Sequence, residues 1–292
     1  MRLVIFWSLA LCLLVACDGA KEKPDPGKSA EASSETQAIA VEADQLIEDS
    51  LSATQIDLLE RFYQWVETGI RERTAYGAPW QQNIDYLGKL IDEADTAFEQ
   101  ELYNRALREQ YGRLIYPFKT QSVIDLYGEH GVVISEADAA AIHPRMGTFI
   151  FKADEANTEW LKAELTRRND EWWTISEFGE DVSRHVWLLT QHADHDRDFQ
   201  RHVLKLMEPL AATDEILPRN FAYLYDRVAV GEARPQRYGS QLGCYDGVFH
   251  TGPLEQPDKV DALRASVGLG PLQVYIDGEF FDQSRAICEA AD

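Results

Sequence analysis

The sequence lacks the short motifs that mark the commonest catalytic and redox sites. It contains no CxxC pair, so thioredoxin-like and zinc-ribbon sites have no support. It has neither the HExxH motif of zinc peptidases nor the GxSxG elbow that presents a nucleophilic serine. Ser240 therefore has no nucleophile motif around it, and any chemistry must come from residues that the fold brings together.

Positive charge is also scarce. The chain has 28 lysines and arginines against 50 aspartates and glutamates, which gives a formal charge of −22 over 292 residues. Nucleic-acid binding depends largely on basic side chains at phosphates, and adsorption to anionic lipid headgroups needs them too. The composition therefore predicts no nucleic-acid partner. It permits basic partners or bound cations, although such a charge is most often a solvated surface.

Long apolar runs are absent except at the start. Leu3–Ala16 is apolar apart from Ser8, which is shorter than the ~20 residues of a membrane-spanning helix. The run follows Arg2 and has the length of the apolar part of a secretory signal. It ends in Leu14–Cys17, which resembles the lipobox of bacterial lipoproteins. The resemblance implies cleavage after Ala16 and lipid on Cys17, whereas the alternative is an ordinary signal peptide with a chance cysteine.

Residues 18–50 contain no aromatic side chain and cannot bury enough apolar surface to fold. We expect signal peptide 1–16, then lipidated Cys17 and a flexible tether to residue 50, with an end-to-end distance of roughly 30 Å. A helix over residues 38–49 is the alternative for the last third. The expected location is the cell envelope, lipid-anchored and facing the periplasm. Asp18 resembles an inner-membrane retention signal and favours that membrane.

The rest of the chain predicts a mainly α protein: a helical array with a small β-hairpin near the C-terminus. Apolar residues recur at three- and four-residue steps from Leu58 onward, which is typical of amphipathic helices. Asp246-Gly247 between β-prone runs predicts the hairpin. Residues 148–152 suggest one further short strand. We divide this part into a helical region of unknown role, 51–152, and a helical domain with the hairpin, 153–292.

Cysteine is rare, with four in the whole chain. Cys12 leaves with the signal and Cys17 carries lipid, so Cys244 and Cys288 remain in an oxidising compartment. A bridge between them would stabilise the fold by about 4 kcal/mol in the chain-entropy model. The sequence cannot show that the two come close enough, so two separate thiols remain the alternative.

The densest polar cluster is Gln191–Asp196, which contains His192. His185 lies seven residues before His192, on the same face of a helix. Imidazole and carboxylate at such spacing suit a metal site or a general base. The competing interpretation is that Asp194 or Asp196 caps the next helix. Without a complete ligand motif, we assign neither a metal nor a cofactor.

Arg227 follows Asp226 directly on a predicted helix, and neighbours on a helix do not face each other. Arg227 must therefore find a partner elsewhere. One interpretation is structural, with Arg227 reaching an acid such as Asp194. The other is recognition of an anionic ligand by the guanidinium group.

The C-terminal half carries polar and aromatic motifs in a characteristic order. They are Glu171–Ser176, Gly179, Gln191–Asp194, Ala222–Arg227, Pro235–Gln241, Arg264 and Gly268–Leu272. This series resembles the bacterial family called domain of unknown function 6624, over roughly residues 160–275. The family has no assigned reaction. The resemblance implies that six residues belong to one place in the fold: His192, Asp226, Arg227, Gln236, Tyr238 and Gln241.

Together these features predict a membrane-anchored envelope lipoprotein whose folded part is a binding or scaffold module with a polar cleft. Arg227, Gln236, Tyr238 and Gln241 would hold a ligand there. The alternative is a hydrolase, metal-assisted or not, in which His192 is the general base, oriented by Asp226 or Asp194. The expected partners are the membrane, through lipid on Cys17, and an unidentified protein or small polar ligand.

Overall fold

The computed structural model describes residues 51–292 except 75–77, 118, 246, 279–280 and 290–292. The predicted signal peptide, Cys17 and the tether lie outside the described residues. The chain forms two compact units. One contains Asp85–Glu109 and Phe151–Asp292, and the other contains residues 51–84 and Gln110–Ile150.

The smaller unit is built around helix α2, Ala53–Glu72, which packs on α6, Glu136–Met146. Helix α5, Thr120–Glu129, packs on α6 in turn. Ser52 and Gln55 form a capping box that satisfies backbone N–H groups at the start of α2. The apolar stripe seen in the sequence is the buried face of this helix: Leu58, Leu59, Phe62 and Val66. Helices α3, Ala78–Asp92, and α4, Ala97–Ile115, contribute residues to both units.

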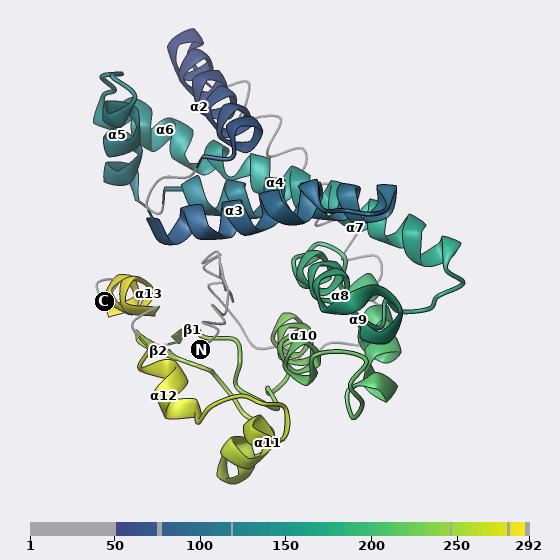
Figure 1. Cartoon of the computed structure of the whole chain (residues 1–292). Coiled ribbons are helices and arrows are strands. Elements are labelled where there is room, and N and C mark those ends of the chain that lie inside the picture. Colours follow the sequence, from purple (N-terminus) through teal and green to yellow (C-terminus); the bar gives the residue numbers. More distant parts are fainter. Residues whose placement is uncertain (1–50, 75–77, 118, 246, 279–280, 290–292) are drawn as a thin grey trace, which may run out of the picture. The chain divides into compact units, whose positions relative to one another are not determined.

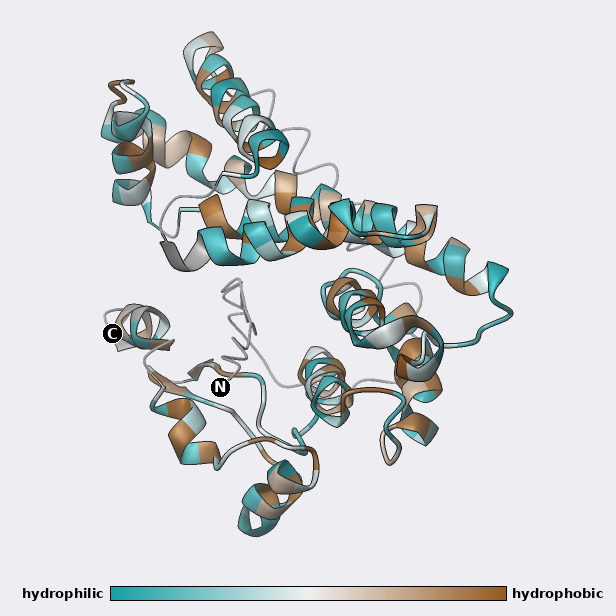
Figure 2. Ribbon diagram, in the orientation of Figure 1, coloured by the Kyte–Doolittle hydropathy of each residue, from teal (hydrophilic) through white to brown (hydrophobic). Residues whose placement is uncertain are grey.

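Three helices form the centre of the larger unit. They are α8, Ile175–Gln191, α9, Arg197–Met207, and α10, Pro218–Gly231. Figure 1 shows them side by side, and α10 packs on both of the others. The 3-10 turn Glu208–Leu210 follows α9 directly. Figure 2 shows apolar and polar residues on different faces of these helices, as the sequence periodicity predicts.

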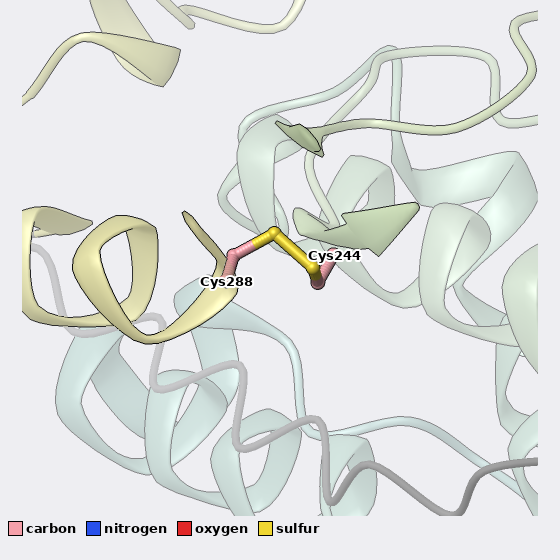
Figure 3. Close-up of a disulfide and its surroundings, with 2 residues drawn as sticks. All are labelled: Cys244 and Cys288. Atoms are coloured by element: carbon pink, nitrogen blue, oxygen red, sulfur yellow. A yellow bond between two sulfur atoms is a disulfide. The ribbon is translucent and has the colours of Figure 1, made fainter. Parts of the chain in front are cut away.

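A two-stranded hairpin follows the three helices. Strands β1, Gly243–Tyr245, and β2, Val248–His250, pair antiparallel with Cys244 opposite Phe249. A 3-10 turn and three short helices complete the unit: Pro257–Lys259, α11 at Val260–Ser266, α12 at Leu272–Ile276 and α13 at Asp282–Glu289. A disulfide joins Cys244 of β1 to Cys288 of α13 (Figure 3).

The predicted class, mainly α with a small C-terminal hairpin, is confirmed. The short strand expected at residues 148–152 is wrong, because helix α7 spans Thr148–Arg167. Ile150 and Ala153 are buried and Leu161 follows at helical spacing, so burial along the whole helix overrides the β-prone start. No helix among the described residues is long and apolar enough to cross a membrane.

Candidate functional site: a buried polar network

Asp226 is the centre of the polar network in the larger unit. It lies on α10 and is fully buried. Its Oδ1 accepts the backbone N–H of Arg237 at 2.7 Å, and its Oδ2 accepts that of Ser240 at 2.8 Å. The backbone N–H of Tyr238 reaches both oxygens. Burial raises the pKa of Asp226, although these three N–H groups oppose the rise. Asp226 therefore fixes the loop that leads to the hairpin.

Gln236 fixes the other side of the same loop. Its side-chain amide donates to the carbonyl of Gln241 at 2.8 Å and also to the carbonyl of Thr251, while its Oε1 accepts the backbone N–H of Gln241. The side chain of Gln241 donates to the hydroxyl of Ser240 and accepts from Arg227 at 3.4 Å. Both glutamines are buried, and their polar groups are used within the protein.

Arg264, which lies on α11, is the last member of the network. Its guanidinium is buried and donates to the carbonyls of Tyr238 at 2.8 Å and Gly270 at 2.6 Å. It also lies 4.8 Å from the centre of the Tyr275 ring, in a cation–π contact. Gly239, in the loop that Arg264 holds, has a φ of +62°, which a glycine adopts without strain.

Arg227 and Asp194 form a forked ion pair at the edge of this network. The Nε of Arg227 donates to Asp194 at 2.9 Å and Nη2 donates to the second carboxylate oxygen. Arg197 adds a further bond at 3.2 Å. Desolvation alone would raise the pKa of Asp194, but the charges and bonds of Arg227 and Arg197 hold it at about 2. This is the structural pairing that the sequence suggested for Arg227.

His192 lies at the C-terminal end of α8, and it is 4% exposed. Its Nδ1 hydrogen-bonds to Glu109 of α4, a fully buried carboxylate. Asp154 of α7, 7% exposed, is the third member. One oxygen from each carboxylate and one ring nitrogen of His192 lie within 4.8 Å of one another. Three helices thus bring three ionisable side chains together, and we call them the His192 cluster.

The hydrogen bond of His192 to a carboxylate goes to Glu109 and not to the predicted Asp226 or Asp194, although the charge of His192 contributes to lowering the pKa of Asp194. His192 bonds to Glu109, and the oxygens of Asp226 accept backbone N–H groups instead. Hydrogen bonds, with Ser240 as an intermediary, link the other five residues of the predicted site: Asp226, Arg227, Gln236, Tyr238 and Gln241. Five of the predicted residues thus form one buried network, whereas His192 hydrogen-bonds to Glu109.

Two other residues that the sequence grouped with His192, Asp196 and His185, have structural roles. Asp196 caps α9 by accepting the backbone N–H of Phe199 at 2.9 Å, and it also pairs with Lys162 of α7. His185 is buried against the edge of the Tyr103 ring and hydrogen-bonds to the carbonyl of Asp181. Helix capping was the alternative interpretation of this segment.

Sequence reasoning missed Glu109 and Asp154. Each lies on the apolar stripe of its helix: Glu109 comes seven residues after buried Leu102, and Asp154 comes seven before buried Leu161. A carboxylate on the apolar face of a predicted helix is unusual, and this was the signal that could have pointed to both residues. The pairing itself was not predictable, since Glu109 and His192 are 83 residues apart.

Fold and site together define a helical protein in which a buried polar network ties a C-terminal hairpin to α10. Residues 132–282 match the family described as Family of unknown function (DUF6624), and the chain belongs to this family. No curated protein and no solved structure is similar enough to this chain to count as a match.

Proposed function

We propose that this protein is a cell-envelope lipoprotein, held at a membrane by lipid on Cys17, that acts by binding and not by catalysis. One observation supports the second claim, that the protein acts by binding and not by catalysis. The polar side chains grouped by the family motifs are used in internal hydrogen bonds, Asp226 to three backbone N–H groups above all. Side chains bonded in this way stabilise a rigid module and leave few groups for chemistry on a substrate.

Two features support the proposed location. The apolar leader ending at Cys17 resembles a lipoprotein signal, and Asp18 favours retention at the inner membrane. The bridge between Cys244 and Cys288 suits an oxidising compartment such as the periplasm. With diacylglycerol on sulfur and a further acyl chain such as palmitate on the amine, anchoring would be stable.

Replacing Cys17 by serine tests the anchor. The native protein should fractionate with membranes, and mass spectrometry should find Cys17 as the N-terminal residue carrying lipid. The Cys17→Ser variant should keep its leader uncleaved and carry no lipid. A native protein with an unmodified sulfur at position 17, or with an intact leader, would overturn the proposed location.

A hydrolase is the second candidate, because Glu109 hydrogen-bonds to His192 as a carboxylate does when it orients a catalytic imidazole. The experiment is a panel of chromogenic carboxylic and phosphoric esters. Turnover by the native protein that is lost in His192→Gln would replace the binding proposal with this one. We expect no turnover, because His192 is buried.

A further inference from the structure

We propose that Glu109, Asp154 and His192 bind a divalent transition-metal ion, with Zn²⁺ and Mn²⁺ as the best matches. The proposal names a ligand for the binding module and in that respect rests on the proposed function. It starts from the geometry of the His192 cluster, in which three donor atoms from α4, α7 and α8 lie within 4.8 Å of one another.

The donor types fit such an ion. Imidazole nitrogen and carboxylate oxygen bind Zn²⁺ at about 2.0–2.2 Å, and carboxylates also suit Mn²⁺. Two ligands of a tetrahedral ion at those distances are about 3.4 Å apart. The ligand atoms of the cluster therefore need to move by no more than about 1.4 Å, which rotation of the side chains can supply.

Charge points the same way. Two carboxylates and a neutral imidazole would give a divalent ion ligands with a total charge of about −2. Binding would release any proton held between His192 and Glu109, because metal ligands must be deprotonated.

The surroundings offer second-shell partners for the ion. Gln191, also buried, places its amide 3.4 Å from Nε2 of His192. Asn157 lies one turn after Asp154 on α7, and its Nδ2 is buried without a hydrogen-bond partner among the described residues. A water molecule carried by the ion is an acceptor of the kind that this amide lacks.

The experiment uses the full-length protein, stripped with a chelator and dialysed against ZnCl₂ or MnCl₂. We expect one equivalent of one of these ions per chain by elemental analysis, together with a higher melting temperature. His192→Ala and Asp154→Asn should each weaken binding by more than the roughly 10- to 100-fold lost with second-shell partners. If His192→Ala fails to fold, Asp154→Asn still decides, because its amide has nearly the same size.

His202→Ala is the matched control. His202 lies 3.3 Å from Asp170, and the two side chains are 44% and 60% exposed, so the pair represents adventitious surface binding. This variant should bind metal as the native protein does. No stoichiometric ion in the native protein, or equal binding by Asp154→Asn, overturns the proposal. A metal-free protein that still carries lipid on Cys17 and turns over no ester would end this inference and leave the proposed function standing.

Discussion

At the scale of single residues, the larger unit contains ionisable groups whose environment changes their titration. His185 is an example, since it is a buried residue of α8 that packs against the ring of Tyr103. Burial lowers the pKa of His185 to about 4, and the positive charge of Arg184 adds to the effect. The imidazole is therefore neutral in the folded protein at pH 7.

His185 should make the protein less stable in acid. The unfolded chain binds a proton near the ordinary pKa of about 6.5, whereas the folded chain does so only near 4. Stability is thus unaffected above pH 6.5 and is lost as the pH falls through this window, by about 3 kcal/mol at pH 4. In His185→Gln this loss should disappear. Urea unfolding between pH 7 and 4 measures it.

The informative quantity is the difference in unfolding free energy between the native protein and His185→Gln at each pH. It should move in favour of the variant as the pH falls. Parallel curves for the native protein and His185→Gln would contradict the role of burial.

At the scale of elements, helix α8 contains a break that depends on one residue. Gly179 has φ +84° and ψ 164° inside the helix. Only glycine adopts this conformation without strain, since a Cβ atom would meet the backbone on either side. The break separates the first turn, Ile175–Phe178, from the buried part of α8 that ends beside His192.

Gly179→Ala should destabilise the protein by about 1–3 kcal/mol through backbone strain alone. Beyond the adjacent residues and the nearby backbone of α8, no described atom lies within 4 Å of the added Cβ, so a clash with other parts of the protein plays no part. The matched control is Gly128→Ala in α5, where the space is equally open and φ is not positive. That change should be neutral or stabilising by up to about 1 kcal/mol. Thermal unfolding of both variants compares the two changes. Equal effects on stability would show that the positive φ of Gly179 is not the cause of the destabilisation.

Elements with a local signal were predictable from the sequence. Asp246-Gly247 indicated the hairpin, and apolar periodicity indicated α2, α8 and α10. The start of α7 was not predictable, because Phe149 and Ile150 are β-prone and only long-range packing makes them helical. Within the site, adjacent residues facing apart on α10 indicated that Arg227 pairs away from Asp226, and Asp194 was one of two interpretations of its partner. The His192 cluster depends on three helices distant in sequence, which no local pattern encodes.

At the scale of the whole molecule, covalent and polar ties fix the C-terminal part of the larger unit. The disulfide joins β1 to α13, and Phe249 of β2 contacts the ring of Phe281 just before α13. Asp226 and Arg264 hold the loop before the hairpin from α10 and α11. These ties keep short elements in place that could not bury enough surface by themselves.

Removing the disulfide by the double change Cys244→Ser and Cys288→Ser should cost about 4 kcal/mol, as its sequence separation of 44 residues implies. The melting temperature should fall on the order of 10 °C. A reducing agent should lower the melting temperature of the native protein to the same value and should not affect the double variant. If the reductant leaves the native protein unchanged while the bridge is shown to be open, the stabilising role is wrong.

One carboxylate links two helices of the larger unit. Asp196 caps the first turn of α9 and also pairs with Lys162 of α7. Desolvation opposes its ionisation, but the bond from Lys162 and the N–H of Phe199 lower the pKa of Asp196 below its usual value. Protonation of Asp196 in strong acid would therefore weaken the N-terminal cap of α9 and the ion pair with Lys162 of α7 at the same time. Amide hydrogen exchange at residues 197–200 would register this coupled loosening.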